Sequence, residues 1–305
     1  MKEKRNIAAS VRQRLLNKAR EQSEEFQNIL IRYALERLLY RLSQSQYRNR
    51  FILKGAIVFS VWSNEPHRTT RDLDLLSYGE NTLSYLEQVF RDICSVQVAA
   101  DGIEFQNNTV RCEQIKVLQK YSGVRIKLTA ILANAQIPIQ IDIGFGDAVT
   151  PAPIELELPT LLEFPAPKVP TYPRETVVAE KFQAMVMLGI ANTRLKDFYD
   201  LLFLAMNFTF EGEPLSLAMK ATFDRRSTPL PTETPLALTA SFAEDSAKKQ
   251  AWQAFLRKGK LKANRLTLSE VVAILRNFIM PPALAAARGE SFNQVWTPGG
   301  TWVEV

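Results

Sequence analysis

Residues 68–76 read RTTRDLDLL, and the interpretation of the whole chain turns on them. The segment 72–76 predicts a short strand, in which successive side chains point to opposite faces. Asp72 and Asp74 then share one face, while Leu73 turns toward the core. Two neighbouring carboxylates repel each other, and a divalent cation such as Mg²⁺ removes that cost. Such pairs also occur on solvated strand edges, so the pair alone leaves both interpretations open.

Two later segments alternate apolar and polar residues with a period of two, which is typical of half-buried strands. In 124–132 (VRIKLTAIL), Arg125 and Lys127 alternate with apolar residues, and in 137–144 (IPIQIDIG), Asp142 faces away from the isoleucines. We therefore expect Asp142 to be a third carboxylate on an exposed strand face, although a solvated strand residue explains it equally well. Three carboxylates on adjacent strands can hold two Mg²⁺ ions about 3.5–4 Å apart, an arrangement suited to phosphoryl transfer.

The remaining pattern predicts an α+β region followed by a mainly helical region. Seven of the 16 prolines fall within 151–173, which we expect to connect two domains, 1–160 and 161–305. A long loop is expected at 222–240, and a strand or turn entering a helix at 50–62. Weaker strands are expected at 103–106 and 112–118, and helices at 8–42, 80–94, 174–189, 194–206, 246–258 and 267–278.

The composition narrows the classes of function. The 305 residues are 46% hydrophobic and 23% charged, which suits about two domains with buried cores. One histidine, His67, and two cysteines, Cys94 and Cys112, disfavour histidine-dependent triads, zinc sites and a disulfide framework. No apolar run approaches the roughly 18 residues of a membrane span and no secretory leader is visible, so a cytoplasmic chain is expected. Any chemistry should then belong to carboxylates, lysines and a hard metal.

Residues 1–20 carry a net charge of +6, equal to that of the whole chain, and a second basic run lies at 248–265; either run suits an anionic partner or a solvated helix face. Within the second run Trp252 and Phe255 lie three apart, as expected for base stacking or for core anchors of an amphipathic helix. The first run comprises Lys2, Lys4, Arg5, Arg12, Arg14, Lys18 and Arg20, and the second comprises Lys248, Lys249, Arg257, Lys258, Lys260, Lys262 and Arg265.

Two blocks of residues together resemble a known family. The first is Leu53-Lys54-Gly55-Ala56 followed by Arg68-x-Thr70-x-Asp72-Leu73-Asp74. The second is Ala179-Glu180-Lys181-x-x-Ala184 followed by Arg194-x-Lys196-Asp197-Phe198-Tyr199-Asp200. In this order and separation they resemble the AbiEii/AbiGii toxin family, which includes the MenT toxins, within the DNA polymerase β-type nucleotidyltransferase superfamily. The resemblance runs from about residue 30 to about residue 210.

The resemblance implies a Mg²⁺-dependent enzyme, with two ions, that transfers a nucleotidyl group from an NTP to an RNA acceptor, tRNA in the related toxins. It also implies the toxin of a toxin–antitoxin system in phage defence by abortive infection, with a cognate antitoxin or transcriptional regulator as partner. By position, Asp72 and Asp74 match the metal carboxylates, Asp142 takes the place of the third, and Lys181 and Asp197 match the essential pair. The residues expected to contact the nucleotide are Lys54, Gly55, Ala56, Thr70 and Lys181.

One position departs from the family pattern. Ala56 stands where the family has serine, so no hydroxyl can reach a phosphate there and a cradle must use backbone N–H groups. Two alternatives therefore stay open: a degenerate fold that binds NTP or RNA without turnover, and an enzyme that modifies a protein or a small molecule. In the second block, Arg194 and Asp197 can also form a plain intrahelical ion pair, with Asp200 supporting Asp197.

Overall fold

The computed structural model describes residues 6–63, 67–117, 121–261 and 266–304, which group into two compact units. Unit 1 takes its residues from Met1–Gly146 and Ile154–Thr171, and unit 2 from Asp147–Pro153 and Tyr172–Val305. The proline-rich stretch is therefore shared between the units rather than being a simple connection. The domain division expected at residue 160 stays a prediction.

Unit 1 is built on a seven-stranded mixed sheet in the order β3-β4-β5-β2-β1-β7-β6. Strand β2 runs parallel to β5 and antiparallel to β1, while β3, β4 and β5 form an antiparallel meander. Strand β7 extends the sheet parallel to β1, and β6 pairs antiparallel with β7. The strands are β1 (Phe51–Lys54), β2 (Asp72–Ser77), β3 (Ile103–Val117), β4 (Tyr121–Leu132), β5 (Ala135–Phe145), β6 (Ile154–Glu157) and β7 (Lys168–Thr171).

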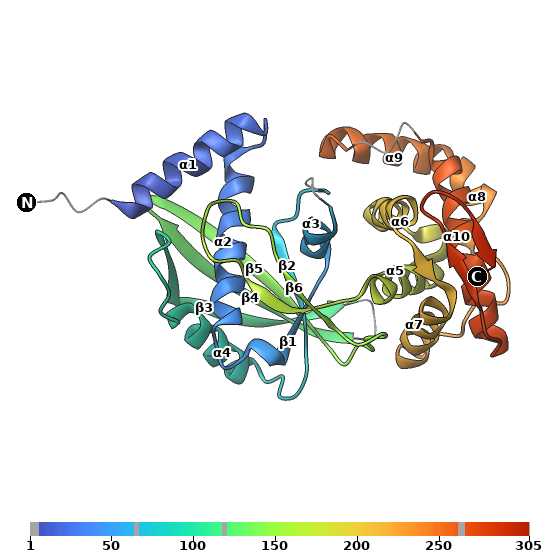
Figure 1. Cartoon of the computed structure of the whole chain (residues 1–305), viewed down its shortest axis with the longest axis horizontal. Coiled ribbons are helices and arrows are strands. Elements are labelled where there is room, and N and C mark those ends of the chain that lie inside the picture. The colour runs from blue at the N-terminus through green and yellow to red at the C-terminus, as the bar shows by residue number, and fades with distance from the viewer. Residues whose placement is uncertain (1–5, 64–66, 118–120, 262–265, 305) are drawn as a thin grey trace, which may run out of the picture. The chain divides into compact units, whose positions relative to one another are not determined.

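Helices cover the apolar face of this sheet, with α2 over β5 and α4 over β3 (Figure 1). Leu73 and Leu75 of β2 join Ile141 and Ile143 of β5 in the core beneath them, each at most 1% exposed. Because strand side chains alternate, the polar residues between these positions lie on the opposite face. The helical segments of unit 1 are α1 (Ile7–Glu21), α2 (Phe26–Ser43), η1 (Arg48–Arg50), η2 (Ala56–Val58), α3 (Phe59–Trp62) and α4 (Leu83–Ser95).

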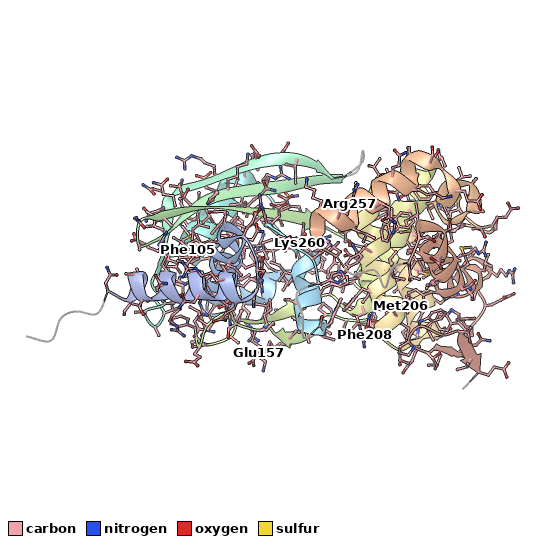
Figure 2. The ribbon with its side chains drawn as sticks, turned by 90° about the horizontal axis from the view of Figure 1, so that it is seen from above. Phe105, Glu157, Met206, Phe208, Arg257 and Lys260 are labelled. Atoms are coloured by element: carbon pink, nitrogen blue, oxygen red, sulfur yellow. The ribbon has the colours of Figure 1, made fainter. Side chains whose placement is uncertain are left out.

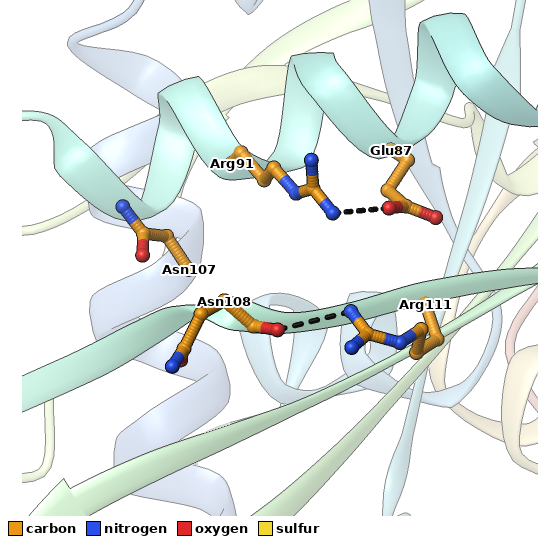
Figure 3. A pocket seen from close by; sticks show the side chains of 5 residues that line it. All are labelled: Glu87, Arg91, Asn107, Asn108 and Arg111. Atoms are coloured by element: carbon orange, nitrogen blue, oxygen red, sulfur yellow. Dashed lines mark hydrogen bonds and ion pairs between the residues drawn. The ribbon is translucent and has the colours of Figure 1, made fainter.

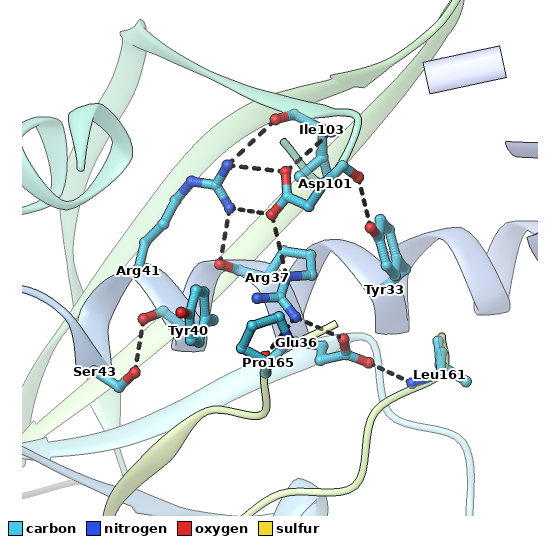
Figure 4. A network of polar contacts seen from close by, with 10 residues as sticks. All are labelled: Tyr33, Glu36, Arg37, Tyr40, Arg41, Ser43, Asp101, Ile103, Leu161 and Pro165. Carbon is cyan, nitrogen blue, oxygen red and sulfur yellow. Dashed lines mark hydrogen bonds and ion pairs between the residues drawn. The ribbon is translucent and has the colours of Figure 1, made fainter. Parts of the chain in front are cut away.

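A buried polar network fixes α2 against the start of β3 (Figure 4). Asp101 accepts hydrogen bonds from Arg37 Nε at 3.1 Å and from Arg41 at 2.8 and 3.1 Å. Tyr33 Oη donates to the Asp101 carbonyl at 2.6 Å, and the Leu161 amide donates to Glu36 at 2.7 Å. These groups are almost fully buried, and each charge has a partner, which is what makes their burial tolerable.

Unit 2 is mainly helical, as expected for the C-terminal part, and adds a small sheet in the order β10-β9-β8. Its first segment, Asp147–Pro153, is tied to it by Arg226, which donates to Asp147 at 3.0 and 3.2 Å. The elements are α5 (Arg174–Leu188), η3 (Gly189–Ala191), α6 (Leu195–Asn207), β8 (Phe210–Glu211), α7 (Gly212–Arg225), η4 (Leu236–Leu238), α8 (Ala240–Glu244), α9 (Ser246–Gly259), α10 (Leu268–Arg288), β9 (Gln294–Trp296) and β10 (Trp302–Glu304).

Helix α10 runs ten residues beyond the expected end at 278, through Pro281 and Pro282. Pro282 has no N–H to donate to the Phe278 carbonyl, and Trp302 Nε1 donates to that carbonyl at 3.0 Å instead. By length and composition the helix could cross a membrane, a test that core helices also pass. Val271 and Leu275 are fully buried in the core of unit 2, as is usual for a core helix.

Three further expectations differ from the structure. The single helix expected at 8–42 is wrong, because Ser23 adopts a left-handed conformation (φ 50°) that ends α1 before α2 begins. The two weak strands are one strand, β3, with a register shift between Gln106 and Arg111. The loop expected at 222–240 is shorter, because α7 extends to Arg225 and η4 lies within it.

The first prediction concerns pH. Burial raises the pKa of Glu36 to about 7, against the opposing Leu161 amide and Arg37. The folded chain then holds this proton more tightly than the unfolded chain, so the free energy of unfolding falls as pH rises from about 4.5 to about 7. Glu36→Gln should remove that fall, on the order of 3 kcal/mol. Urea titrations from pH 4.5 to 7.5 measure the free energy of unfolding of both proteins. The Glu36→Gln curve against pH should converge toward, or cross, the wild-type curve as pH rises. Parallel curves would contradict the assignment.

Candidate functional site

A row of charged residues crosses the polar face of the unit 1 sheet. The register pairs Lys54 of β1 with Asp74 of β2, Asp74 with Asp142 of β5, and Asp142 with Arg125 of β4. Residues directly opposite one another in neighbouring strands point to the same face. Asp72, two residues before Asp74, shares this face and lies opposite Gln140. The structure thus brings together the three carboxylates that the sequence singles out.

The turn after β1 packs directly against Asp74. Gly55 has φ 77° and ψ −157°, a region that only glycine adopts readily. A Cβ on Gly55 would lie 2.0 Å from Asp74 Oδ2 and 2.7 Å from Asp74 Cβ. Glycine is therefore required here both by the backbone conformation and by the close approach to the carboxylate.

Arg125 belongs to the row but lies outside the two motifs of the family resemblance. Its Nε donates to Asp142 Oδ1 at 2.8 Å and its Nη2 to Oδ2 at 2.8 Å, a bidentate pair. The hydrogen bond to Asp142, followed by the charges of Asp142 and Asp72, raises the pKa of Arg125. The alternation in 124–132 is the signal that could have found it, because it places Arg125 on the exposed face of a strand. The pair orients Asp142 and neutralises its charge.

The donor set suits a hard cation held partly by substrate. Asp72 and Asp74 offer oxygen ligands on one strand, and Mg²⁺ commonly takes one or two carboxylates together with phosphate oxygens. Among the described residues, no group of three His, Cys, Asp or Glu is arranged to hold a metal ion. Both oxygens of Asp142 accept from Arg125, and this cation already balances the charge of the carboxylate, which weakens Asp142 as a metal ligand. The residues present therefore fit Mg²⁺ at Asp72 and Asp74 but not a preformed three-carboxylate cage.

Of the other residues expected to contact a nucleotide, Lys54, Ala56 and Thr70 belong to unit 1 with this row, whereas Lys181 belongs to unit 2. Lys54 is half-buried opposite Asp74, and Ala56 is 8% exposed at the start of η2, directly after the Gly55 turn. Thr70 precedes β2, and its hydroxyl donates to the Asp72 carbonyl at 3.2 Å. That bond supports the turn into β2, one of the two roles that a threonine at this position can have.

In unit 2, the second motif forms a buried ion cluster. Lys181 of α5 donates to Asp197 at 2.8 Å and to Asp200 at 2.7 Å, both from α6. Arg194 Nε lies 2.6 Å from Asp197, so the expected pair is present, although Arg194 is the N-cap residue that precedes α6. Asp197 and Asp200 are fully buried, whereas the Lys181 side chain is 14% exposed. Two cations thus balance two buried carboxylates, and the cluster joins α5 to α6.

The described part of the second basic run lies on and just after α9, a helix with a buried aromatic side and exposed cations. Trp252 is fully buried and donates from Nε1 to the Leu266 carbonyl at 3.2 Å, and Phe255 packs against Trp252 and Tyr199. Trp252 is therefore a core anchor rather than a stacking platform. The exposed cations of this run are Lys249, Arg257, Lys258 and Lys260; Figure 2 labels Arg257 and Lys260.

Several cations of the two basic runs lie outside the described residues. These are Lys2, Lys4, Arg5, Lys262 and Arg265. Within the first run, Arg12 of α1 lies over the Phe26 ring at 5.3 Å, and Arg14 and Arg20 are exposed. The first run thus retains exposed positive charge on α1.

A hollow of about 430 Å³ lies between α4 and the irregular part of β3 (Figure 3). Arg91 pairs with Glu87, and Arg111 Nη1 donates to the backbone carbonyl of Asn108 at 2.9 Å. The charged groups of this hollow thus bond to other residues that line it, and no residue of the carboxylate row lines it. We therefore place the candidate site at the row.

Comparisons with known proteins agree with the resemblance. A family model described as the nucleotidyl transferase AbiEii toxin of a type IV toxin–antitoxin system matches residues 37–277, more than half of the chain. No curated relative matches the chain significantly. A Helicobacter pylori structure described as that of a candidate nucleotidyltransferase has 16% identity and a TM-score of 0.45, over 84% of this chain and 95% of that one. The structure of JHP933 from Helicobacter pylori has 15% identity and a TM-score of 0.43, over 83% and 89%.

The second prediction tests the turn at Gly55. Gly55→Ala should lower the free energy of unfolding by at least about 3 kcal/mol, because strain at this φ and ψ adds to a clash with Asp74. Gly289→Ala is the matched control, since Gly289 also has positive φ (69°) but nothing within 4 Å of a Cβ. The control should lose about 1 kcal/mol. Equal losses in urea titrations would show that Asp74 does not constrain the turn.

The third prediction tests the ion cluster. Lys181→Met should cost about 3–5 kcal/mol of unfolding free energy, because it removes the cation shared by two buried carboxylates and leaves Arg194, at Asp197, as the remaining cation of the cluster. Lys196→Met, at an exposed position on the same motif, should change stability by less than about 0.5 kcal/mol. Thermal unfolding of both variants measures the difference, and a stable Lys181→Met protein would show that the cluster has no structural role.

Proposed function

Because the chain belongs to the AbiEii nucleotidyl transferase toxin family of type IV toxin–antitoxin systems, we propose that it transfers a nucleoside monophosphate from an NTP to a hydroxyl of RNA. We propose Mg²⁺ as the cofactor, tRNA as the acceptor class, the cytoplasm as the location, and a cognate antitoxin as the protein partner. The observation that carries the proposal is the row of Lys54, Asp74, Asp142 and Arg125 beside the Gly55 turn.

The proposed reaction forms one bond and breaks one bond. The acceptor oxygen bonds to the α-phosphorus of the NTP, the bond from that phosphorus to the pyrophosphate oxygen breaks, and the hydroxyl proton passes to solvent. Bound Mg²⁺ would supply positive charge for the α-phosphate and the leaving pyrophosphate, held by Asp72 and Asp74. Lys54 and the backbone N–H groups that follow Gly55 would bind the triphosphate.

Asp142 and Arg125 would contact the RNA acceptor rather than the NTP. Each carboxylate oxygen has more than one lone pair, so Asp142 can accept a hydrogen bond from a hydroxyl while it remains paired with Arg125. This orients the acceptor and requires no release of the arginine. Lys181 and Asp197, proposed as essential by position, would contribute through the integrity of the α5–α6 pair as well as through any contact with substrate.

Exposed positive charge supports an RNA acceptor. Lys249 and Arg257 lie eight residues apart on α9, about 12 Å along the helix, with Gln253 between them on the same side. Lys260 follows the end of the helix in a left-handed conformation (φ 51°). Cations spaced along a helix can follow the phosphates of a nucleic acid strand, and such binding weakens with salt.

The fourth prediction tests the carboxylates. Asp72→Asn and Asp74→Asn should each lower nucleotide transfer by at least about 100-fold and leave the unfolding transition unchanged, because the amides fit the same positions but lack the negative charge that balances a divalent cation. Purified protein, MgCl₂, α-labelled NTPs and bulk tRNA measure the transfer. Asp224→Asn, at an exposed position of α7, is the control and should keep full activity. Undiminished transfer in both variants would show that these carboxylates are not catalytic.

Ala56 favours one alternative, a degenerate protein that binds NTP without turnover, because no hydroxyl is present at that position. In the same assay such a protein would bind labelled NTP in equilibrium dialysis but label no RNA. Label on protein or on a small molecule would instead assign a different acceptor to the same fold.

A further inference from the structure

A cavity opens beside Asp72 where β2 stops short of its neighbour. β5 begins at Ala135, but its paired register with β2 begins only at Gln140, opposite Asp72. At this step in the sheet lies a cavity of about 480 Å³, within the range of about 300–1,000 Å³ typical of small-ligand sites. All the residues that line it belong to unit 1.

The walls of the cavity combine apolar side chains with groups that both donate and accept hydrogen bonds. Pro138 of β5 supplies exposed apolar surface, next to the largely buried Ile31 of α2 and Ile139 of β5. Gln27 and Gln140 bring side-chain amides, each of which is both donor and acceptor, and Thr129 brings a hydroxyl. A nucleobase needs this combination, because its faces are apolar and its edge carries donors and acceptors side by side.

Two cations flank the same cavity. Lys127 pairs with Glu113 at 2.7 Å, and both side chains are at least half exposed, so the pair is weak and exchangeable. Arg71 donates from Nε to Asn28 at 3.1 Å, and its Nη2 lies 3.6 Å from Glu25 in a second exposed pair. Exposed cations at the edge of a base-sized cavity suit the backbone phosphates that adjoin a bound nucleoside.

The position of the cavity separates it from the proposed triphosphate site. In the strand order, β1 with Lys54 and the Gly55 turn lies on one side of β2, and β5 and β4, which line the cavity, lie on the other. Asp72 belongs both to the cavity wall and to the proposed catalytic pair. A nucleoside in the cavity therefore meets the carboxylates from the side opposite the proposed NTP phosphates.

We infer that this cavity is the acceptor subsite, which holds the terminal nucleoside of the RNA strand with its ribose beside Asp72. The inference rests on the proposed function and adds to it the place where the acceptor binds. Gln27 and Gln140 contact the base edge, and Lys127 and Arg71 contact the adjoining phosphates.

The kinetic experiment uses two variants and a matched control. Gln140→Leu removes the amide at nearly constant size, and Thr129→Phe fills the cavity. Each should raise the KM for bulk tRNA at least 10-fold and leave the KM for NTP within twofold. Gln136→Leu, at an exposed position of β5 outside the cavity, should change neither. Unchanged KM values for tRNA in both variants would overturn the inference, and a rise confined to the KM for NTP would assign the cavity to the donor base instead.

A crosslinking experiment keeps the inference testable without turnover. A short oligoribonucleotide that ends in 4-thiouridine is irradiated with the full chain, and the crosslinked peptides are identified by mass spectrometry. Crosslinks to 127–129 or 138–140 are expected, and crosslinks only elsewhere, or none, would overturn the subsite. If wild-type protein crosslinks there but transfers no nucleotide, the proposed reaction fails while the binding site stands.

Discussion

The parallel pairing of β2 with β5 is the constraint on which the candidate site depends. It sets Asp74 opposite Asp142, and the next pairs outward add Lys54 and Arg125 on the same face. A slip of one residue would turn every side chain of β2 to the other face, placing Leu73 and Leu75 in water and both aspartates in the core. The burial of these leucines therefore fixes the register, and the register fixes the carboxylates. The energy that orders the site comes from the apolar side of the sheet.

Much of this arrangement follows from the sequence. Alternation in 72–76, 124–132 and 137–144 predicts three strands and the face that each polar residue occupies, because a period of two is a local property of the chain. The helices of unit 2 follow similarly from their period and caps. The order of strands in the sheet is a non-local property, so the motif resemblance, rather than the periodicity, suggested that Asp142 belongs beside Asp74.

Other features were not predictable because their causes are tertiary or involve single residues. The break between α1 and α2 depends on one left-handed serine, Ser23, within an otherwise helical pattern. Helix α10 continues through Pro282 because the side chain of Trp302, twenty residues later, bonds the carbonyl that proline leaves unpaired. The pairing of Asp142 with Arg125 required knowing that β4 lies next to β5. Each of these depends on a neighbour that no local window of sequence contains.

Ion pairing changes how the motif residues should be interpreted. Asp142 is held by Arg125, and Asp197 is held by Lys181 and Arg194. A residue in such a pair can be indispensable because it keeps its partner in place, with no contact to substrate. Loss of activity in a variant of the second motif therefore has two physical explanations, and a measurement of folding separates them.

The interleaving of the two units governs how the protein can be divided. Strand β7 pairs along β1 and comes from Ile154–Thr171, after the chain has already contributed Asp147–Pro153 to unit 2. A fragment that stops at Gly146 therefore lacks β6 and β7 and leaves the backbone of β1 as an open edge, which invites association with other chains. A cut after Thr171 retains β6 and β7 but separates Asp147–Pro153 from its hydrogen-bond partners Arg226 and Thr176. Neither unit can be excised intact by one cut, so an isolated catalytic fragment would have to be re-joined with a new linker in place of Asp147–Pro153.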